Sequence, residues 1–259
     1  MKTNKMGFNK CDWETPDGFP DISENQVHIW RVNTIDFSNL TQEFENLLNE
    51  TEKKRANQFK YEKSKERFII CRGALRFMLS RYLKENPASI GIFENQGGKP
   101  EITDKYHQHA LEFNISHSNE ICLIAFSQNL ELGIDVEAIR PFGELEDMAK
   151  SFLSKRELAA FNSCTPEKKP IKFFDLWSAK EALLKAIGCG LMIQPNQIEI
   201  EEILEKKKFS VQYRSNVIEM PHIEMIALNG LGGYAAWLVV AGEVGKISKF
   251  RFSKQLVSI

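Results

Sequence analysis

Apolar residues recur along this chain at two spacings, one typical of helices and one typical of strands. The segment 171–188 shows the helical spacing clearly, because Leu176, Ala179, Leu183 and Ala186 fall on one stripe when it is wound at about 3.6 residues per turn. This stripe predicts an amphipathic helix that buries one face in the core.

The opposite stripe of the same helix carries Trp177, Glu181 and Lys185. One interpretation is an exposed ion pair between residues four apart, which is common on surface helices. The alternative is a face covered by other chain or by a ligand, since Phe174 and Leu184 lie on or beside this stripe. A covered carboxylate and ammonium would need partners, which makes this helix a candidate for function.

Further helical and alternating patterns follow in an order that repeats. Helices are predicted over 40–48, 51–84 and 142–160, and strands over 26–32, 111–116, 121–127, 130–138, 198–203, 209–213, 222–227 and 234–240. Helices followed by strands therefore occur twice, which predicts an α+β fold of two similar lobes with a ligand cleft between them. We expect a loose N-terminal arm over 1–25, a first lobe over 26–138 and a second lobe over 139–259.

The composition is that of an ordinary globular protein, and it limits the classes of molecule that the protein is expected to bind. The 259 residues carry a formal net charge of −1, which argues against a general nucleic-acid-binding protein. Residues 53–85 nevertheless contain eleven Lys and Arg against three Glu, so an anionic partner is expected to bind near them. Five scattered cysteines without a Cys-x-x-Cys motif, and no long apolar segment, predict a cytoplasmic protein without a membrane partner.

Two carboxylates occur together in one predicted strand. Asp135 and Glu137 are two residues apart, so their side chains share one face of the strand while Ile134 and Val136 occupy the other. Neighbouring like charges repel unless a cation lies between them, and hard oxygen ligands favour Mg²⁺ over Zn²⁺. A solvated strand face is the simpler explanation of the pair alone, but Glu181 offers a third carboxylate and strengthens the metal interpretation.

Two other groups of residues suit an anionic ligand. Ser116 and His117 lie at the end of a predicted strand, where phosphate or base contacts fit them better than a Ser–His nucleophile pair does; a polar turn is the alternative. Arg55 and Arg67 lie in a lysine-rich helical stretch, and their forked guanidinium groups match phosphate oxygens. A solvated helix face is the alternative there.

Several short motifs follow one another along the chain. They are Gly98-Lys99-Pro100, Asn114-Ile115-Ser116-His117-Ser118, Gly133-Ile134-Asp135-Val136-Glu137, Phe152 with Glu157, and Trp177-Ser178-Ala179-Lys180-Glu181 with Lys185 and Gly188. In order and separation they resemble the motifs of 4′-phosphopantetheinyl transferases of the surfactin-synthetase-activating type. The resemblance covers about residues 27 to 240, and its specificity comes from the joint occurrence of motifs that are weak singly.

The resemblance implies two α+β lobes related by a pseudo-twofold axis, with coenzyme A bound in the cleft. Such enzymes transfer the 4′-phosphopantetheine arm of coenzyme A to a serine of an apo acyl- or peptidyl-carrier protein. By their place in the motifs, Asp135, Glu137 and Glu181 would bind Mg²⁺. Glu181 would also accept the serine proton, directly or through a water.

The resemblance also assigns the cationic and polar residues to coenzyme A. Lys180 and Lys185 would contact the pyrophosphate, and Lys185 would serve catalysis by neutralising its charge. Contacts to the nucleotide and its phosphates would come from Arg55, Arg67, Lys99, Ser116 and His117.

Two alternatives remain open at this level. A magnesium-dependent nuclease could use the same carboxylates, but it leaves the Ser116-His117 and Gly98-Lys99 segments without a role. A non-catalytic protein that binds coenzyme A or carriers would be expected to lack a metal ligand, whereas all three carboxylates are present. Because one chain supplies both halves of the expected site, we also expect a monomer.

Overall fold

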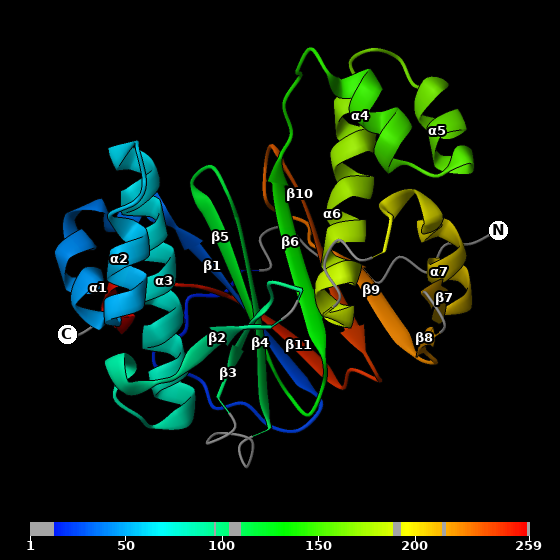
Figure 1. Cartoon of the computed structure of the whole chain (residues 1–259). Coiled ribbons are helices and arrows are strands. Elements are labelled where there is room, and N and C mark those ends of the chain that lie inside the picture. The colour runs from blue at the N-terminus through cyan, green and yellow to red at the C-terminus, as the bar shows by residue number, and fades with distance from the viewer. Residues whose placement is uncertain (1–12, 96, 104–109, 189–192, 214–215, 258–259) are drawn as a thin grey trace.

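The computed structural model describes residues 13–95, 97–103, 110–188, 193–213 and 216–257. Two lobes lie side by side, and each combines a β-sheet with helices packed on its outer side (Figure 1). The predicted α+β class with two similar lobes is therefore confirmed. None of the described helices is both long enough and apolar enough to cross a membrane.

The first lobe is built on a four-stranded sheet. Its strands, in spatial order, are β11 (Lys246–Arg251), β1 (Gln26–Asn33), β5 (Ile121–Gln128) and β4 (Leu111–Ser118). Its helices are α1 (Thr41–Leu47), α2 (Glu50–Ala56) and α3 (Glu62–Leu83), and a small hairpin joins β2 (Ile92–Glu94) to β3 (Pro100–Ile102). Apolar side chains of α3 pack with Trp30 and Phe126 on one face of the sheet.

The second lobe is built on a three-stranded sheet. Its strands, in spatial order, are β6 (Leu132–Ala138), β10 (Tyr234–Ala241) and β9 (Ile223–Ala227). The long helix α6 (Lys169–Ile187) packs across β6 and β10. The remaining elements are α4 (Leu145–Phe152), α5 (Lys155–Asn162), α7 (Ile200–Lys206) and the hairpin of β7 (Phe209–Tyr213) with β8 (Asn216–Met220).

The two sheets pack against each other through a shared apolar cluster. Ile29 and Leu123 from the first sheet meet Ile134, Val136 and Leu238 from the second, and all five side chains are fully buried. The order of layers is therefore helix, sheet, sheet, helix, with α3 and α6 on the outside. Burial of this interface fixes the position of one lobe relative to the other.

Strand pairing crosses the lobe boundary that we expected between residues 138 and 139. The strand predicted over 130–138, which we expected in the first lobe, belongs to the second sheet, because β6 pairs with β10. Both edges of β5 are already taken by β1 and β4, so no position beside it is left for β6. At the other end of the chain, β11 returns to the first lobe and pairs in parallel with β1.

Several predicted elements are confirmed and others need correction. The structure contains the strands expected over 26–32, 111–116, 121–127, 130–138, 209–213, 222–227 and 234–240 and the helices expected over 40–48 and 171–188. The strand predicted over 198–203 is wrong, because most of it lies in α7. Ile200 and Ile203 are both buried three residues apart, which is the helical spacing rather than the strand spacing.

The two longer helical predictions, 51–84 and 142–160, each contain a break. In the first, α2 ends at Ala56 and α3 begins at Glu62. In the second, Ser154 stands between α4 and α5 and caps α5, because its hydroxyl accepts a hydrogen bond from the backbone N–H of Glu157.

The N-terminal arm predicted over 1–25 is only partly tested, since residues 1–12 lie outside the described part of the chain. From Trp13 onward the chain contacts both lobes, because the Trp13 indole donates to the backbone oxygen of Asn229 and Glu14 pairs with β11. Trp13 is buried, and the ring of Phe19 stacks on Trp30 with 5.1 Å between ring centroids. Buried Trp13 and half-buried Phe19 therefore anchor the described part of the arm, while most of its other residues are exposed.

Candidate active site

The close approach of α6 to β6 sets the geometry of the site. A Cβ added to Gly133 would lie 2.1 Å from the backbone oxygen of Ala182 and 2.4 Å from the backbone nitrogen of Ala186. No side chain fits in that space, so glycine at position 133 allows α6 to pack this closely against β6. Asp135 and Glu137 follow on the same face of β6, and Glu181 and Lys185 of α6 lie against them.

Asp135 is the most tightly held carboxylate of the site. Its Oδ1 accepts hydrogen bonds from Lys185 Nζ at 2.7 Å and from Ser116 Oγ at 2.8 Å. Lys185 Nζ also donates to the backbone oxygen of Ile134 at 3.2 Å. The second oxygen, Asp135 Oδ2, is buried and has no hydrogen-bond partner. A buried carboxylate oxygen without a donor is costly, so this atom is available to a cation or to a proton donor of a ligand.

The other two carboxylates carry charge that the protein does not fully neutralise. Burial raises the pKa of Glu137, and the charge of Asp135 raises it further. Burial also raises the pKa of Glu181, with Asp135 and Glu137 adding to the shift while Lys185 opposes it. Three carboxylates therefore share one region in which Lys185, and Arg140 beside Glu137, offset only part of their repulsion, and a bound cation would relieve the rest.

A row of side chains from β4 joins the two sheets directly beside these carboxylates. Asn114 Oδ1 accepts from the backbone N–H of Ile134 at 2.9 Å, Ser116 Oγ from that of Val136 at 3.4 Å, and Ser118 Oγ from that of Ala138 at 3.1 Å. We call these three β4 residues the polar ladder. They accept hydrogen bonds from backbone N–H groups of β6 that would otherwise face β4 without a partner.

The polar ladder also orients the carboxylates. The Ser116 hydroxyl donates to Asp135, and the Ser118 hydroxyl donates to Glu137 Oε2 at 2.9 Å. The hydroxyl of Ser116 is therefore engaged within the protein, whereas the sequence suggested that it contacts nucleotide. The alternation of Asn114, Ser116 and Ser118 was a signal that sequence analysis overlooked, because it marks a polar face on an otherwise apolar strand.

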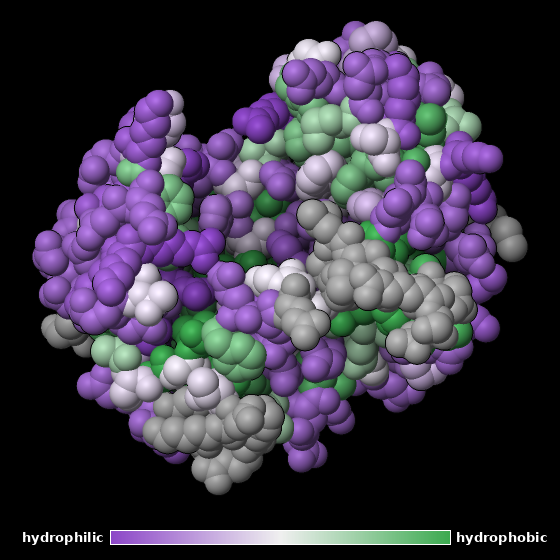
Figure 2. Space-filling model, in the orientation of Figure 1, coloured by the Kyte–Doolittle hydropathy of each residue, from purple (hydrophilic) through white to green (hydrophobic). Residues whose placement is uncertain are grey.

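A cavity of about 230 Å³ opens beside the carboxylates. Glu181 and Lys185 line it from α6, Asn114 from β4, and Lys99 from the turn between β2 and β3. The Lys99 side chain is almost fully buried, and its amine forms an ion pair with Glu131 at 3.0 Å. Figure 2 shows that the surface is hollowed between the two lobes and that hydrophilic residues cover much of the first lobe beside the hollow. The structure thus brings together Lys99, Glu181 and Lys185, as the sequence predicted.

The residues assigned to coenzyme A phosphates lie at the margin of this region. His117 is exposed, and its pKa is lowered by partial desolvation and by the charges of Arg67 and Lys185. Arg67 donates to the backbone oxygen of Asn119 at 3.2 Å. Because His117 is close enough to feel both cations, an anion beside it would meet positive charge from each lobe.

Arg55 lies farther out, on α2. Its guanidinium forms an ion pair with Glu94 at 2.6 Å, and both side chains are about half exposed. Glu94 belongs to β2, next to the turn that carries Lys99. Arg55 would have to exchange this partner for a phosphate, and an exposed ion pair of this kind contributes little to stability.

Lys180 does not lie with the other cations, and its assignment to the pyrophosphate needs correction. Its side chain is fully buried, and Nζ forms an ion pair with Glu157 at 2.5 Å and donates to the backbone oxygen of Pro195 at 2.8 Å. Burial lowers the pKa of Lys180 in spite of Glu157. The lysine therefore ties α6 to the start of α5. In a helix at about 100° per residue, Glu181 faces the cavity and Lys180 is turned away from it.

Oxygen donors of the site fit Mg²⁺. Within the described part of the chain, no three His, Cys, Asp or Glu side chains are already arranged as a metal site. However, Asp135 Oδ2 lacks a partner, and the pKa values of Glu137 and Glu181 are raised in part by mutual repulsion. Hard carboxylate oxygens of this kind, completed by waters and phosphate oxygens, are what Mg²⁺ binds.

Comparison with known proteins places both halves of the chain in one family. A family model described as the 4′-phosphopantetheinyl transferase superfamily matches residues 131–230, and a model of the N-terminal part of 4′-phosphopantetheinyl transferases matches residues 30–129. The two matched ranges adjoin, and they contain β6 with α6 and β4 with α3, respectively.

Individual relatives agree with the family models. The chain is 36% identical over 170 residues to the 4′-phosphopantetheinyl transferase HetI of Nostoc sp., which covers 66% of this chain and 72% of HetI. It is 33% identical to a putative 4′-phosphopantetheinyl transferase of Synechocystis sp. (64% of this chain, 67% of the relative) and 28% identical to 4′-phosphopantetheinyl transferase Sfp of Bacillus subtilis (58% and 64%). The chain belongs to the 4′-phosphopantetheinyl transferase family.

Proposed function

We propose that this protein transfers the 4′-phosphopantetheine arm of coenzyme A to a serine of an apo acyl- or peptidyl-carrier protein, in a reaction that requires Mg²⁺. The second product is adenosine 3′,5′-bisphosphate. Membership of the transferase family supports the reaction. The observation that carries the metal and the reacting centre is the buried, unpartnered Oδ2 of Asp135 between two carboxylates of raised pKa.

The residues of the chain have separate tasks in this reaction. The serine oxygen forms a bond to the β-phosphorus of the pyrophosphate, and the bond from that phosphorus to the bridging oxygen breaks, which leaves the bisphosphate as leaving group. Such a transfer depends on positioning and on neutralising charge. Lys185 and Lys99 line the cavity beside Glu181 and supply fixed positive charge there.

Glu181 is the residue that we assign to the serine proton. It faces the cavity from the middle of a rigid helix, where a carboxylate can accept the proton of a serine that enters the cavity. Asp135, Glu137 and Glu181 would hold Mg²⁺, which when bound supplies Lewis-acid stabilisation of the pyrophosphate charge. Ser116 and Ser118 keep two of these carboxylates in place.

Two further observations support a transferase of the surfactin-synthetase-activating type and a cytoplasmic location, respectively. One chain holds both the N-terminal and the superfamily match, so both lobes can contribute to a single cleft. Cys71 and Cys122 are near enough to share a hydrogen bond and are nevertheless free thiols. Neighbouring free thiols are typical of a reducing compartment.

Mass spectrometry of intact carriers tests the proposal. A panel of apo carriers from fatty-acid, polyketide and nonribosomal peptide synthesis is incubated with the protein and coenzyme A, with either Mg²⁺ or a chelator. We expect one carrier or more to gain the mass of one phosphopantetheine only when Mg²⁺ is present, and a Ser→Ala carrier to gain nothing. No gain on any carrier would contradict the proposed reaction, and an equal gain with chelator would contradict the metal requirement.

A further inference from the structure

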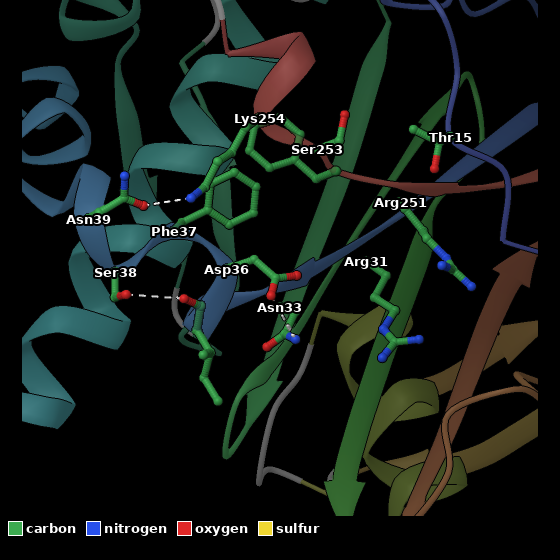
Figure 3. A pocket seen from close by; sticks show the side chains of 12 residues that line it. Thr15, Arg31, Asn33, Asp36, Phe37, Ser38, Asn39, Arg251, Ser253 and Lys254 are labelled. Carbon is green, nitrogen blue, oxygen red and sulfur yellow. Dashed lines mark hydrogen bonds between the residues drawn. The ribbon is translucent and has the colours of Figure 1, made fainter.

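Apolar residues anchor the first two helical elements of the first lobe. Phe37 of η1 (Thr34–Leu40) and Phe44 of α1 are fully buried, and their ring centroids lie 5.7 Å apart. Figure 3 shows that Lys254, which follows β11, also binds η1, because its amine donates to Asn39 Oδ1 at 2.6 Å. Burial of aromatic side chains, with a polar contact in addition, therefore sets the position of η1 and α1.

The next helix, α2, has no apolar anchor of this kind. Among its seven residues, all of which the structure describes, only Glu52 and Ala56 are buried. A helix of this length is not stable in water by itself, so contacts with the rest of the lobe must hold it. Because Ala56 contributes a single methyl group, the contacts of Glu52 chiefly determine where α2 lies.

Glu52 is bonded through both of its carboxylate oxygens. Its Oε1 accepts from Arg72 Nε at 2.6 Å, and its Oε2 accepts from Arg76 Nε and, at 3.0 Å, from the backbone N–H of Asn49 at the start of α2. The two arginines lie one turn apart on α3, and Arg76 is fully buried. Charge-assisted hydrogen bonds of this kind have a narrow geometry, so they fix α2 to one position on α3.

The same network reaches the hairpin of β2 and β3. Arg76 Nη1 donates to the backbone oxygens of Pro87 at 2.5 Å and Ile90 at 3.1 Å, in the segment that leads into β2. Glu94 of β2 is the residue with which Arg55 of α2 forms its ion pair. Arg55 and its present partner are therefore both placed by contacts to α3.

We propose that Glu52 is a positioning residue for the binding of coenzyme A. It fixes α2 so that the exposed guanidinium of Arg55, three residues later on the same helix, is in place to meet a phosphate group of the ligand. The inference rests on the proposed function, in which Arg55 contacts coenzyme A. Glu52 itself touches no ligand. By fixing α2 in advance, it lowers the entropy that is lost when the ligand binds.

Steady-state transfer by the Glu52→Gln variant tests the proposal, at saturating carrier and Mg²⁺. We expect KM for coenzyme A to rise about tenfold and kcat to stay within about twofold of wild type, since a contact made equally in the ground and transition states affects KM alone. The direction is informative, because loss of a negative charge would by itself favour an anionic ligand. An unchanged or lower KM would overturn the proposal.

A double-mutant cycle tests whether Glu52 acts through Arg55. In the Arg55→Ala background, Glu52→Gln should raise KM no further, because the group that it positions is gone. Additive effects of the two substitutions would overturn the proposal, and so would an Arg55→Ala protein with the KM of wild type. Isothermal titration of coenzyme A gives the same comparison without a carrier. The inference can therefore fail while the transfer reaction stands, and the transfer reaction can fail while the inference stands.

Two further variants separate positioning from stability. Arg72→Gln removes one of the two arginine partners and should raise KM about threefold, so it serves as evidence if Glu52→Gln does not fold. Leu79→Ala is the matched control, because it truncates a fully buried apolar side chain of the same helix, α3. It should lower the free energy of unfolding and leave KM for coenzyme A unchanged. An equal rise of KM in Leu79→Ala would show that KM follows stability, which would overturn the proposal.

Discussion

Asp135 combines two functions within one side chain. One oxygen is fixed by Lys185 and Ser116, and the other is buried without a partner. The fixed oxygen sets the orientation of the carboxylate, and the free oxygen then has a defined position toward a ligand. Glu137 and Glu181 lie near enough to feel this charge, so the behaviour of each carboxylate depends on the other two.

Replacement of Glu181 by Gln tests its role at the reacting centre. The substitution keeps the size of the side chain and nearly the same helix propensity, so the fold and the binding of coenzyme A should persist. It removes the proton acceptor, which alone contributes roughly 10²–10⁴-fold to the rate of transfer, and it removes one negative charge from the metal site. We expect single-turnover transfer to an apo carrier to fall by about 10³-fold or more. A variant that retains more than about a tenth of the rate would show that Glu181 is neither base nor essential ligand.

The same residue should govern the pH dependence of stability in metal-free protein. The pKa values of Glu137 and Glu181 are raised in the folded state, so the folded protein binds more protons than the unfolded protein above the ordinary carboxyl range. The free energy of unfolding therefore falls as pH rises through the folded pKa values. Glu181→Gln should remove part of this decrease in the free energy of unfolding, and the variant should be at least as stable as wild type at neutral pH.

Urea unfolding with chelator between about pH 4 and pH 8 measures this difference. Added Mg²⁺ should stabilise the wild-type protein more than Glu181→Gln, because a cation lowers the same repulsion. A variant that is less stable than wild type at neutral pH without metal would contradict the assignment of repulsion among the three carboxylates.

At the scale of elements, β4 and β6 are edge strands of different sheets that meet through side chains. Asn114, Ser116 and Ser118 accept from three successive outward N–H groups of β6. A backbone ladder would place the strands in one sheet, whereas this polar ladder leaves the sheets separate and puts hydroxyl groups beside the carboxylates. The joint between the lobes is thus also the support of the site.

Removal of the Ser118 hydroxyl tests the polar ladder. Ser118→Ala deletes the donor to Glu137 and the acceptor for the Ala138 N–H, and we expect a loss of about 1–2 kcal/mol in unfolding free energy. A positioning role predicts in addition that the Mg²⁺ concentration for half-maximal activity rises severalfold. Ser163→Ala, which removes an exposed hydroxyl bonded to its own helix, is the control. An unchanged Mg²⁺ dependence would leave Ser118 with a structural role only.

The contact between α6 and β6 can be tested at Gly133. In Gly133→Ala the new Cβ would meet backbone atoms of α6, which cannot rotate away as a side chain can. Overpacking of this kind costs typically 1–3 kcal/mol or more, and we expect about 3 kcal/mol or a failure to fold, measured by urea unfolding. Gly232→Ala should be nearly neutral, since no atom lies within 4 Å of its added Cβ. Equal effects of the two variants would show that the helix does not approach β6 closely.

At the scale of the whole molecule, the chain joins its two lobes at several places. β6 leaves the first lobe to pair with β10, and β11 leaves the second lobe to pair with β1. The apolar cluster between the sheets adds a buried interface. The lobes are therefore expected to unfold together, and the cleft should keep its shape without a partner chain.

We predict that the protein is active as a monomer. One chain supplies every part of the candidate site. The carboxylates lie on β6 and α6, the polar ladder lies on β4, and Lys99 and Lys185 line the cavity. Sedimentation velocity should show a monomer at assay concentrations, and specific activity should not change on dilution. An obligate dimer whose monomers are inactive would contradict this prediction.

The sequence by itself determined the local chemistry. The stripe of Leu176, Ala179 and Leu183 predicted α6, and the alternation in β6 put Asp135 and Glu137 on one face, because both patterns depend only on residue spacing. Spacing also placed Glu181 and Lys185 together on one face of the helix. For the same reason the α+β class and the shorter elements other than 198–203 could be read directly from the chain.

The tertiary structure alone decided which of these residues meet. Lys180 and Glu181 are neighbours in sequence, yet one is buried against Glu157 and the other faces the cavity, because α6 is covered on nearly all sides. The spacing of residues along one segment cannot reveal a contact with another segment. Long-range packing therefore decided three features: the polar ladder, the pairing of β6 and β11 with strands of the other lobe, and the close contact that requires glycine at position 133.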